Sequence, residues 1–200
     1  MTRVVADMTV TIDGFGSGVG QSLEHPFGHL DRDVLHAWMF DEAAQAASAE
    51  ERDRIVDAGA FVMGRNMFDP GRGDWDLGWR GWWGDEPPYH GPVFVLAHRP
   101  RADLVMEGGT TFHFVTEGPL VALERARDAA GSRDVSIAGG VSTLNQYLAA
   151  GLVDELRLHV SPIVAGAGER VFDGVEAQRW ELVSARQAPL VTHTVYRPAR

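Results

Sequence analysis

The sequence predicts an α/β domain with a mixed, mostly parallel central sheet, helices on both faces and an antiparallel strand pair at the C-terminal end. Up to residue 150, short β-branched segments alternate with amphipathic helical segments. One of these strands, 135–138, runs into Gly139-Gly140, and helical spacing of apolar residues follows at once. Beyond Gly151 the chain contains strand-like segments without a helix between them, which favours antiparallel pairing there.

The composition predicts a single domain over residues 1–200. Of these residues 44% are hydrophobic, which is enough for one core. A formal net charge of −10 is unlike the clustered basic surface that binds nucleic acid or anionic membranes, so we expect neither partner. The absence of cysteine excludes disulfides and thiolate chemistry. With no leader-like N-terminus and no long apolar run, we expect a cytoplasmic protein.

The N-terminal elements follow from β-branched runs and turn signals. Residues 3–12 form a first strand that ends at the turn pair Asp13-Gly14, and a polar, glycine-rich loop then extends to His29. Asp31 or Asp33 can cap a following helix. The apolar residues expected on one face of that helix are Val34, Leu35, Trp38, Met39 and Ala43. A polar stretch, 48–57, leads to a second strand, 60–63, which ends at Gly64-Arg65-Asn66.

The segment 68–89 is rich in glycine, proline and tryptophan and has neither helical nor strand periodicity. A loop of this length in a compact domain usually has a role, such as covering a ligand. The four tryptophans at 75, 79, 82 and 83 are compatible with a substrate lid, and equally with a hydrophobic plug or a subunit contact.

The remaining elements alternate as in an α/β fold. Strands are expected at 93–96, before Ala97-His98-Arg99-Pro100, and at 111–115. The helix 119–130 should turn Leu120, Leu123, Ala126 and Ala130 inward, and the helix after Gly140 should bury Val141, Leu144, Tyr147 and Leu148 and end at Gly151. The last strands are expected at 153–160, 180–185 and 190–196.

The paired glycines Gly139 and Gly140 are the candidate centre of a site. Glycine permits close backbone approach, and the first N–H groups of a helix carry partial positive charge without intrahelical partners. Such a corner suits a phosphate or pyrophosphate, although a simple turn between strand and helix has the same sequence.

Two other strand ends carry groups that bind phosphate, namely Gly64-Arg65-Asn66 and His98-Arg99. Ligands of α/β sheets lie at the carboxyl ends of the strands, so these corners can converge with Gly139-Gly140. Two arginines beside a glycine-rich helix start suggest a nucleotide with an additional phosphate.

In order and spacing, these motifs resemble those of the dihydrofolate reductase-like superfamily, and most closely the reductase domain of riboflavin biosynthesis, the RibD C-terminal domain. The matching segments are 11–15, 62–68, 95–100, 137–140, 153–156 and 162–168. The resemblance implies a dihydrofolate reductase-like three-layer fold and an NADPH-dependent reductase. It places the following residues at the cofactor: Ala6, Ile12, Gly14, Gly64, Arg65, Asn66, His98, Arg99, Gly139, Gly140, Val141, Ser142 and Thr143.

On the substrate side, the resemblance implies a carboxylate in the first helix. Asp33 is the candidate catalytic residue, with Asp31 as a second choice, and both have an N-cap as the alternative interpretation. Trp38 and Trp83 are candidate substrate contacts. The segment up to His29 offers His25 and His29 but no arginine for a ribose phosphate. The chain also lacks the paired cysteines of a fused deaminase.

These observations favour hydride transfer from NADPH to a C=N or C=O carbon of a small, pterin- or pyrimidine-like heterocycle. The alternative is a nucleotide-binding or ligand-sensing protein of the same fold without turnover. A metal-dependent hydrolase is a weaker rival, because the eight histidines contain no helical ligand pair, and we expect no metal site. The resemblance also implies a homodimer formed through the C-terminal strands, with Trp180 or Phe172 in the contact.

Overall fold

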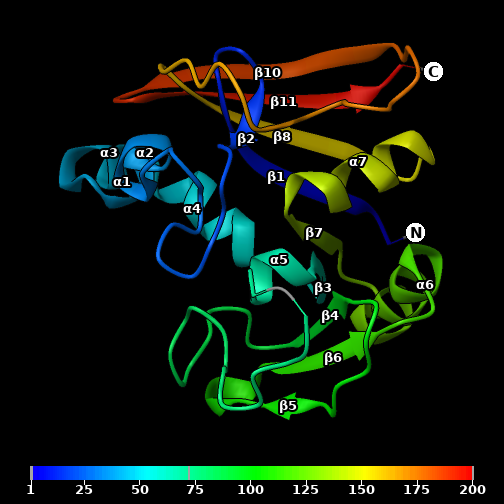
Figure 1. The fold of residues 1–200 in the computed structure, drawn as a ribbon. Helices are drawn as coiled ribbons and strands as arrows, with labels where there is room; N and C mark the ends of the chain where they lie inside the picture. The colour runs from blue at the N-terminus through cyan, green and yellow to red at the C-terminus, as the bar shows by residue number, and fades with distance from the viewer. Residues whose placement is uncertain (1, 72, 200) are drawn as a thin grey trace.

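The computed structural model describes residues 2–71 and 73–199; Met1, Arg72 and Arg200 lie outside the described residues. Its main sheet has nine strands in the order β10-β11-β8-β1-β7-β3-β4-β6-β5 (Figure 1). The strands are β1 (Val4–Thr11), β3 (Ala60–Gly64), β4 (Pro92–Leu96), β5 (Leu104–Val105), β6 (Thr111–Val115), β7 (Val135–Gly139), β8 (Glu155–Ser161), β10 (Trp180–Ala188) and β11 (Val191–Pro198). A separate pair joins β2 (Phe15–Ser17) to β9 (Glu169–Arg170).

The central strands are parallel and the flanking strands are antiparallel, as the sequence predicts. β8, β1, β7, β3, β4 and β6 run parallel, whereas β10, β11 and β5 pair antiparallel with their neighbours. Parallel strands are covered on both faces, which explains the nearly continuous apolar runs of β1, β3 and β4. The expected C-terminal strand pair is confirmed as β10 and β11.

Helices cover both faces of the sheet (Figure 1). On one face α6 (Pro119–Ala130) and α7 (Val141–Ala149) pack on a core that includes Ala6, Met8, Val62 and Ile137. The other face holds α1 (Arg32–Leu35), α2 (Ala37–Phe40), α3 (Glu42–Ala47), α4 (Ala49–Val56), the single turn α5 (Arg65–Phe68) and the tryptophan-rich segment. A short 3-10 turn, η1, spans Glu107–Gly109.

The sheet opens between β1 and β7. These two strands pair only from Val4 with Val135 to Ala6 with Ile137. Beyond this point β1 remains paired with β8 as far as Thr11, while β7 remains paired with β3 as far as Gly139. The carboxyl ends of the two central strands are therefore not paired with each other, and we call this gap in the backbone pairing the opening between β1 and β7. It lies at the edge where α/β proteins bind ligands.

The single helix expected after Asp31 is wrong, because the chain forms four short helices. His36, Asp41 and Ser48 stand at the breaks, and the Asp41 carboxylate accepts a hydrogen bond from the Ala44 N–H, which starts a new helix there. The face predicted for one helix is lost as a result: Leu35 and Trp38 are buried, whereas Val34 and Ala43 are exposed. The polar stretch 48–57 is mostly the helix α4.

The amphipathic pattern of α6 is correct except at its first turn. Leu123, Ala126 and Ala130 are buried as expected, but Leu120 is exposed. The buried face of α6 consists of positions 122, 123, 126 and 130. Leu120 lies outside this face, so Ala122 is the buried residue of the first turn. All four apolar residues expected to be buried on α7 are buried, and Gly151 follows the helix with the positive φ of 65° that a C-terminal glycine adopts.

None of the helices in the described part of the chain is both long and apolar enough to cross a lipid bilayer.

Candidate functional site

Three strand ends predicted to converge are neighbours in the sheet. In the register of the parallel strands, Gly64 of β3 is paired with Leu96 of β4, and Met63 of β3 is paired with Gly139 of β7. Residues that follow these positions therefore leave the sheet at one edge. The candidate phosphate-binding groups thus lie on one rim, which we call the glycine rim and define as Gly64-Arg65, His98-Arg99 and Gly139-Gly140.

The Gly139-Gly140 corner combines a constrained glycine with an open one. Gly139 has a φ of 121°, which only glycine adopts readily, and the peptide bond to Gly140 is cis. Gly140 is the N-cap residue of α7 and has an ordinary φ of −71°. A Cβ atom at Gly140 would meet no other atom within 4 Å, so space lies directly in front of the helix start.

The two hydroxyl residues of α7 have different surroundings. Ser142 is exposed in the first turn, close to the open space at Gly140. Thr143 is buried and packs against the end of β3, where any Cβ at Gly64 would clash with its Oγ1. Gly64 is therefore required for close packing of β3 on α7, and Val141 is likewise buried against Gly16. Of the predicted hydroxyl donors, Ser142 is the accessible one.

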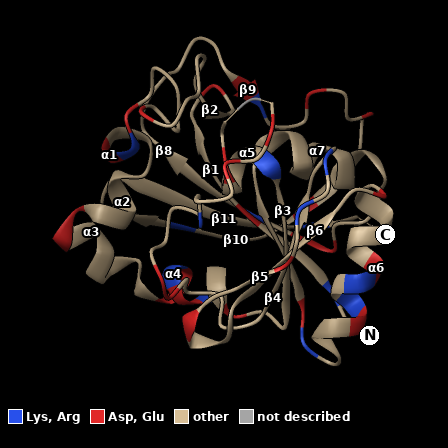
Figure 2. Ribbon diagram, turned by 60° about the horizontal axis from the view of Figure 1, so that its bottom comes forward, with Lys and Arg blue, Asp and Glu red and all other residues tan. Residues whose placement is uncertain are grey.

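Arg65 lies on the rim and is held by the tryptophan-rich segment. Its Nη1 donates to the Gly73 carbonyl at 2.8 Å, and its guanidinium carbon lies 4.1 Å from the centre of a Trp75 ring. The Asp69 carboxylate is 3.8 Å away. Arg65 Nε is buried and has no hydrogen-bond partner among the described residues. This guanidinium therefore retains a free buried donor in the turn that follows β3, and such a donor fits a phosphate-bearing ligand. Figure 2 shows this basic segment on α5.

The other cationic group, Arg99, is paired with a carboxylate of the same segment. Its guanidinium contacts Asp74, and its carbonyl accepts a hydrogen bond from Trp75 Nε1 at 3.1 Å. Both side chains of the ion pair are exposed, and His98 beside them is exposed too. An exposed ion pair of this kind contributes little stability, so Arg99 can exchange Asp74 for another anion. Asn66 lies half-buried in α5, next to Arg65.

The residues predicted to contact the cofactor from the β1 side differ in their exposure. Ala6 is fully buried in the sheet, at the last β1 position paired with β7. Ile12 is exposed just beyond β1, and Gly14 turns the chain with a φ of 85°. Asp13 accepts hydrogen bonds from the Thr11 hydroxyl and from the backbone of 165–166, which hold its pKa at about 2. The Asp13 carboxylate thereby joins the end of β1 to the distant glycine-rich turn.

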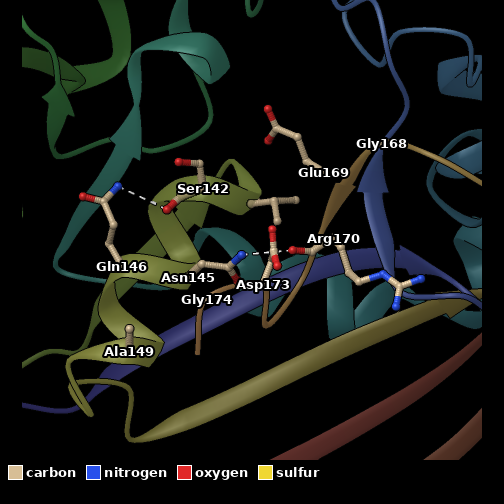
Figure 3. Close-up of a pocket in the computed structure, with 10 residues that line it drawn as sticks. Ser142, Asn145, Gln146, Ala149, Gly168, Glu169, Arg170, Asp173 and Gly174 are labelled. Carbon is tan, nitrogen blue, oxygen red and sulfur yellow. Dashed lines mark hydrogen bonds between the residues drawn. The ribbon is translucent and has the colours of Figure 1, made fainter. Parts of the chain in front are cut away.

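A cavity of about 470 Å³ lies on the outer side of α7 (Figure 3). Residues 168–174 form the wall of the cavity opposite α7. Asn145 of α7 holds this wall in place, because its Nδ2 donates to the Arg170 carbonyl and its Oδ1 accepts from the Phe172 N–H. Val141 and Ser142 at the start of α7 line it, together with Glu169, Arg170 and Asp173. Two carboxylates against one guanidinium give the lining a net negative charge, so the phosphate groups of a nucleotide fit the glycine rim better than this cavity.

Asp33, the candidate catalytic residue, and Trp38, a candidate substrate contact, do not lie in an open pocket. The Asp33 side chain is 69% exposed, and its carboxylate pairs with Arg32 Nε at 2.9 Å on the surface. Asp31 occupies the N-cap position of α1 without a side-chain hydrogen bond to the helix. Trp38 is 0% exposed, and its Nε1 donates to Thr9 Oγ1 at 3.2 Å.

The tryptophan-rich segment folds onto the sheet. Trp83 stacks on Phe112 of β6 and contacts Tyr89 edge-on, while Trp79 Nε1 donates to the Phe68 carbonyl at 2.7 Å. Trp75 is half-buried against Phe114. These contacts match the hydrophobic-plug interpretation for three of the tryptophans, and they place Trp83 in a core cluster rather than over the opening at β1.

A buried polar cluster under α1–α4 was not anticipated from the sequence. It consists of Asp7 on β1, His159 on β8, His193 on β11 and Ser48 between α3 and α4. Each of these residues is 8% exposed or less. The one available signal was an isolated aspartate inside the apolar run of β1, because the four residues are otherwise remote in sequence.

Within residues 2–71 and 73–199, no three His, Asp or Glu side chains gather in an arrangement that could hold a metal ion.

Sequence comparison matches residues 2–193 to the family model of the RibD C-terminal domain. YyaP, an uncharacterized protein of Bacillus subtilis (strain 168), is 22% identical over 184 residues, which cover 87% of this chain and 82% of that protein.

Solved structures with a similar fold include reductases. A protein from Shewanella sp. PV-4 assigned to riboflavin biosynthesis has a TM-score of 0.67 at 23% identity, with both chains covered completely. RibD from Acinetobacter baumannii has a TM-score of 0.62 at 15% identity, and the whole of this chain spans 58% of it. Dihydrofolate reductase from Enterococcus faecalis, solved with NADP(H), has a TM-score of 0.57 at 16% identity, covering 99% of this chain and 97% of that one. These likenesses establish the dihydrofolate reductase-like fold predicted from the sequence.

Proposed function

Because the chain belongs to the RibD C-terminal domain family, we propose that it is an NADPH-dependent reductase. Its substrate would be a small heterocycle of the pterin or pyrimidine type, reduced at a C=N or C=O carbon. The observation that carries this proposal is the glycine rim, where the open helix start at Gly140 lies on the same sheet edge as Arg65 after β3 and Arg99 after β4.

The residues of the rim fit the parts of NADPH. The first N–H groups of α7, with Gly139 and Gly140, suit the pyrophosphate. Arg65 supplies an unused buried donor, and Arg99 with His98 supplies the partners for a 2′-phosphate once Asp74 is displaced. Bound NADPH would supply the hydride, while the protein orients it and excludes water at the opening between β1 and β7.

Titration with NADPH and NADH, followed by absorbance at 340 nm with candidate heterocycles, tests this proposal. We expect tighter binding of NADPH than of NADH, and NADPH oxidation with at least one C=N heterocycle. Binding without oxidation of any candidate would favour the alternative, a nucleotide-binding protein without turnover. Equal affinities for NADPH and NADH would contradict the proposal that Arg99 binds the 2′-phosphate.

We further propose that the chain forms a homodimer through its C-terminal strands. β10 is an edge strand, and it exposes Leu182 and Val183, while Phe172 is also exposed nearby in sequence. An apolar edge strand left in water favours pairing with another chain. Sedimentation equilibrium should give about twice the chain mass of 21.8 kDa at micromolar concentration, and a mass of 21.8 kDa would contradict the dimer.

A further inference from the structure

We propose that Asp7 is the proton donor of the reduction, and that His159, His193 and Ser48 hold its proton through a buried chain of polar contacts. The inference rests on the proposed function, because a proton is required only where a C=N or C=O bond accepts a hydride. It assigns to the buried polar cluster a role that the exposed Asp33 is badly placed to fill.

Asp7 marks the apex of the opening in the sheet. It is the first residue of β1 beyond the short pairing with β7, which ends at Ala6 and Ile137. Gly139 stands at the end of the opposite side of this opening, because β7 follows β3 away from β1. A flat ring that enters between the two strands from the glycine rim therefore approaches Asp7 once the Met8 side chain, whose Cε lies 3.5 Å from the Cβ position of Gly139, moves aside.

The cluster forms a continuous chain of polar atoms. Asp7 Oδ1 lies 3.4 Å from His159 Nε2, His159 Nδ1 lies 2.8 Å from His193 Nδ1, and His193 Nε2 lies 3.1 Å from Ser48 Oγ. Trp38 packs on both imidazoles, with ring centres 4.7 Å from His159 and 5.1 Å from His193. The buried indole therefore fixes the two rings that carry the chain.

The geometry restricts where the protons reside. A hydrogen bond between two Nδ1 atoms requires one donor and one acceptor. If His193 Nδ1–H donates to His159, then His193 Nε2 accepts from the Ser48 hydroxyl, and His159 Nε2–H faces the Asp7 carboxylate. If Asp7 takes up a proton, it can donate to His159 Nε2, which then carries no hydrogen. His159 is in that case protonated at Nδ1 and donates to His193 Nδ1, and His193 is protonated at Nε2, so that His193 Nε2–H faces Ser48 Oγ. Both imidazoles thus reverse their polarity. The chain thus accommodates one additional proton at Asp7.

Two atoms of the buried polar chain from Asp7 to Ser48 lack a hydrogen-bond partner in the described part of the protein. Among the described residues, Asp7 Oδ1 and His159 Nε2 are both buried without a hydrogen bond, although they lie 3.4 Å apart. Buried polar atoms are rarely left in this state unless a ligand or a functional role requires them. The unused capacity lies at the contact between Asp7 and His159, and Asp7 is the residue of this contact that stands where the pairing of β1 with β7 ends.

Charged neighbours support an ionised Asp7 after the proton leaves. Arg157 Nη1 lies 3.4 Å from Asp7 Oδ2 and is itself paired with Glu155. At the other end, His193 faces Glu51 and Arg186, and His36 faces His159 and Arg32. Burial, with His159 close by, lowers the pKa of His193 to about 4, so this imidazole is neutral as the chain requires.

The proton step balances with the cofactor of the proposed function. Bound NADPH would supply the hydride to the substrate carbon and be oxidised, and the electron pair of the C=N or C=O bond would move to the nitrogen or oxygen. That atom takes the proton from Asp7 Oδ1, whose O–H bond breaks. Asp7 remains as a carboxylate beside Arg157, and both imidazoles return to the polarity in which His159 Nε2–H faces it. Asp7 takes up a proton from solvent when the product leaves.

Histidine ¹⁵N NMR tests the chain without any substrate. At neutral pH we expect His193 to be protonated at Nδ1 and His159 at Nε2, and acidification to reverse both rings together. Asp7→Asn should abolish this reversal, because an amide cannot take up the proton. Asp103→Asn is the matched control, since Asp103 pairs with His113 on the surface, so it should change only the His113 signals. A reversal that persists in Asp7→Asn would overturn the proposal.

Turnover provides the second readout, with 7,8-dihydropterin as the C=N probe. Asp7→Asn should lower kcat by at least about 100-fold, in the range of general acid catalysis, and leave the NADPH dissociation constant unchanged. An unchanged kcat would overturn the role of Asp7. His193→Phe should move the pH profile of kcat and leave KM unchanged; a lower Tm with an unmoved profile would remove His193 from the chain. Failure to bind NADPH, or to oxidise it with any probe, would instead contradict the proposed function.

Discussion

The glycine rim and the buried chain from Asp7 to Ser48 differ in how their charged groups find partners. On the rim, Arg99 pairs with an exposed carboxylate, and Arg65 donates to loop carbonyls, so both partners can be replaced by a ligand. In the buried chain, side chains from distant strands satisfy one another, and only Asp7 Oδ1 and His159 Nε2 remain unsatisfied. The rim is therefore suited to capture an anion, and the chain to hold a proton.

The largest effect should come from closing the open position on the rim. Gly140→Val should weaken NADPH binding at least about 100-fold, because a branched side chain would occupy the space in front of α7. The fold should persist, since Gly140 has a negative φ and no atom close to its Cβ position. Calorimetric titration and thermal unfolding measure both quantities.

Gly139→Val is the contrasting variant for this position. With a φ of 121°, Gly139 tolerates no side chain without strain, so its substitution should lower Tm as well as NADPH affinity. If Gly140→Val remained folded and bound NADPH normally, the corner would be only a turn.

The next effect concerns the stability contributed by the tryptophan-rich segment. Trp83→Ala should lower the free energy of unfolding by about 3 kcal/mol, because its ring stacks on Phe112 and contacts Tyr89. The control, Trp82→Ala, removes a more exposed ring and should cost about 1 kcal/mol or less. Urea unfolding measures both. A Trp83→Ala protein with normal stability but reduced kcat/KM would instead support a substrate lid.

A smaller effect separates the two nucleotides. Arg99→Ala should weaken NADPH binding about tenfold or more and leave NADH binding unchanged, since only NADPH carries the 2′-phosphate. Asp74→Asn should strengthen NADPH binding a few-fold, because it removes the competing carboxylate. Arg125→Ala is the control, because Arg125 pairs with Glu117 on the surface. Equal losses for NADPH and NADH in Arg99→Ala would contradict this role.

The smallest effect is a pH dependence of stability. Burial lowers the pKa of His36 and of His193 to about 4. Between their unfolded value near 6.5 and pH 4, the unfolded chain binds more protons than the folded one, so stability falls as the pH is lowered through this window. The free energy of unfolding should drop by ~1 kcal/mol or more from pH 7 to pH 5. His36→Phe should reduce that drop, and a flat profile would show that these imidazoles are not held neutral.

The glycine rim could be predicted from the sequence, because its residues stand in short motifs directly after strands. Gly64-Arg65, His98-Arg99 and Gly139-Gly140 each follow a β-branched run, and parallel pairing brings such ends together. The partner of Arg99 could not be predicted, because nothing local in the sequence brings Asp74 across from a loop of irregular structure.

The buried chain could not be predicted, because its members lie on four elements separated by long stretches of sequence. Periodicity described α7 well but failed after Asp31, where Asp41 starts a new helix and changes the face that each residue presents. The family resemblance places Asp33 in the first helix, and helical periodicity places Trp38 on the apolar face of that helix. Its division leaves the first on the surface and packs the second against the imidazoles of His159 and His193.

A crystal structure of the chain grown with NADPH tests the central claim most directly. The proposed function predicts the pyrophosphate at the N-terminus of α7 beside Gly140, and the 2′-phosphate in contact with Arg99 in place of Asp74. The nicotinamide should enter the opening between β1 and β7. Density for the nucleotide at another site, such as the carboxylate-lined cavity outside α7, would contradict the account.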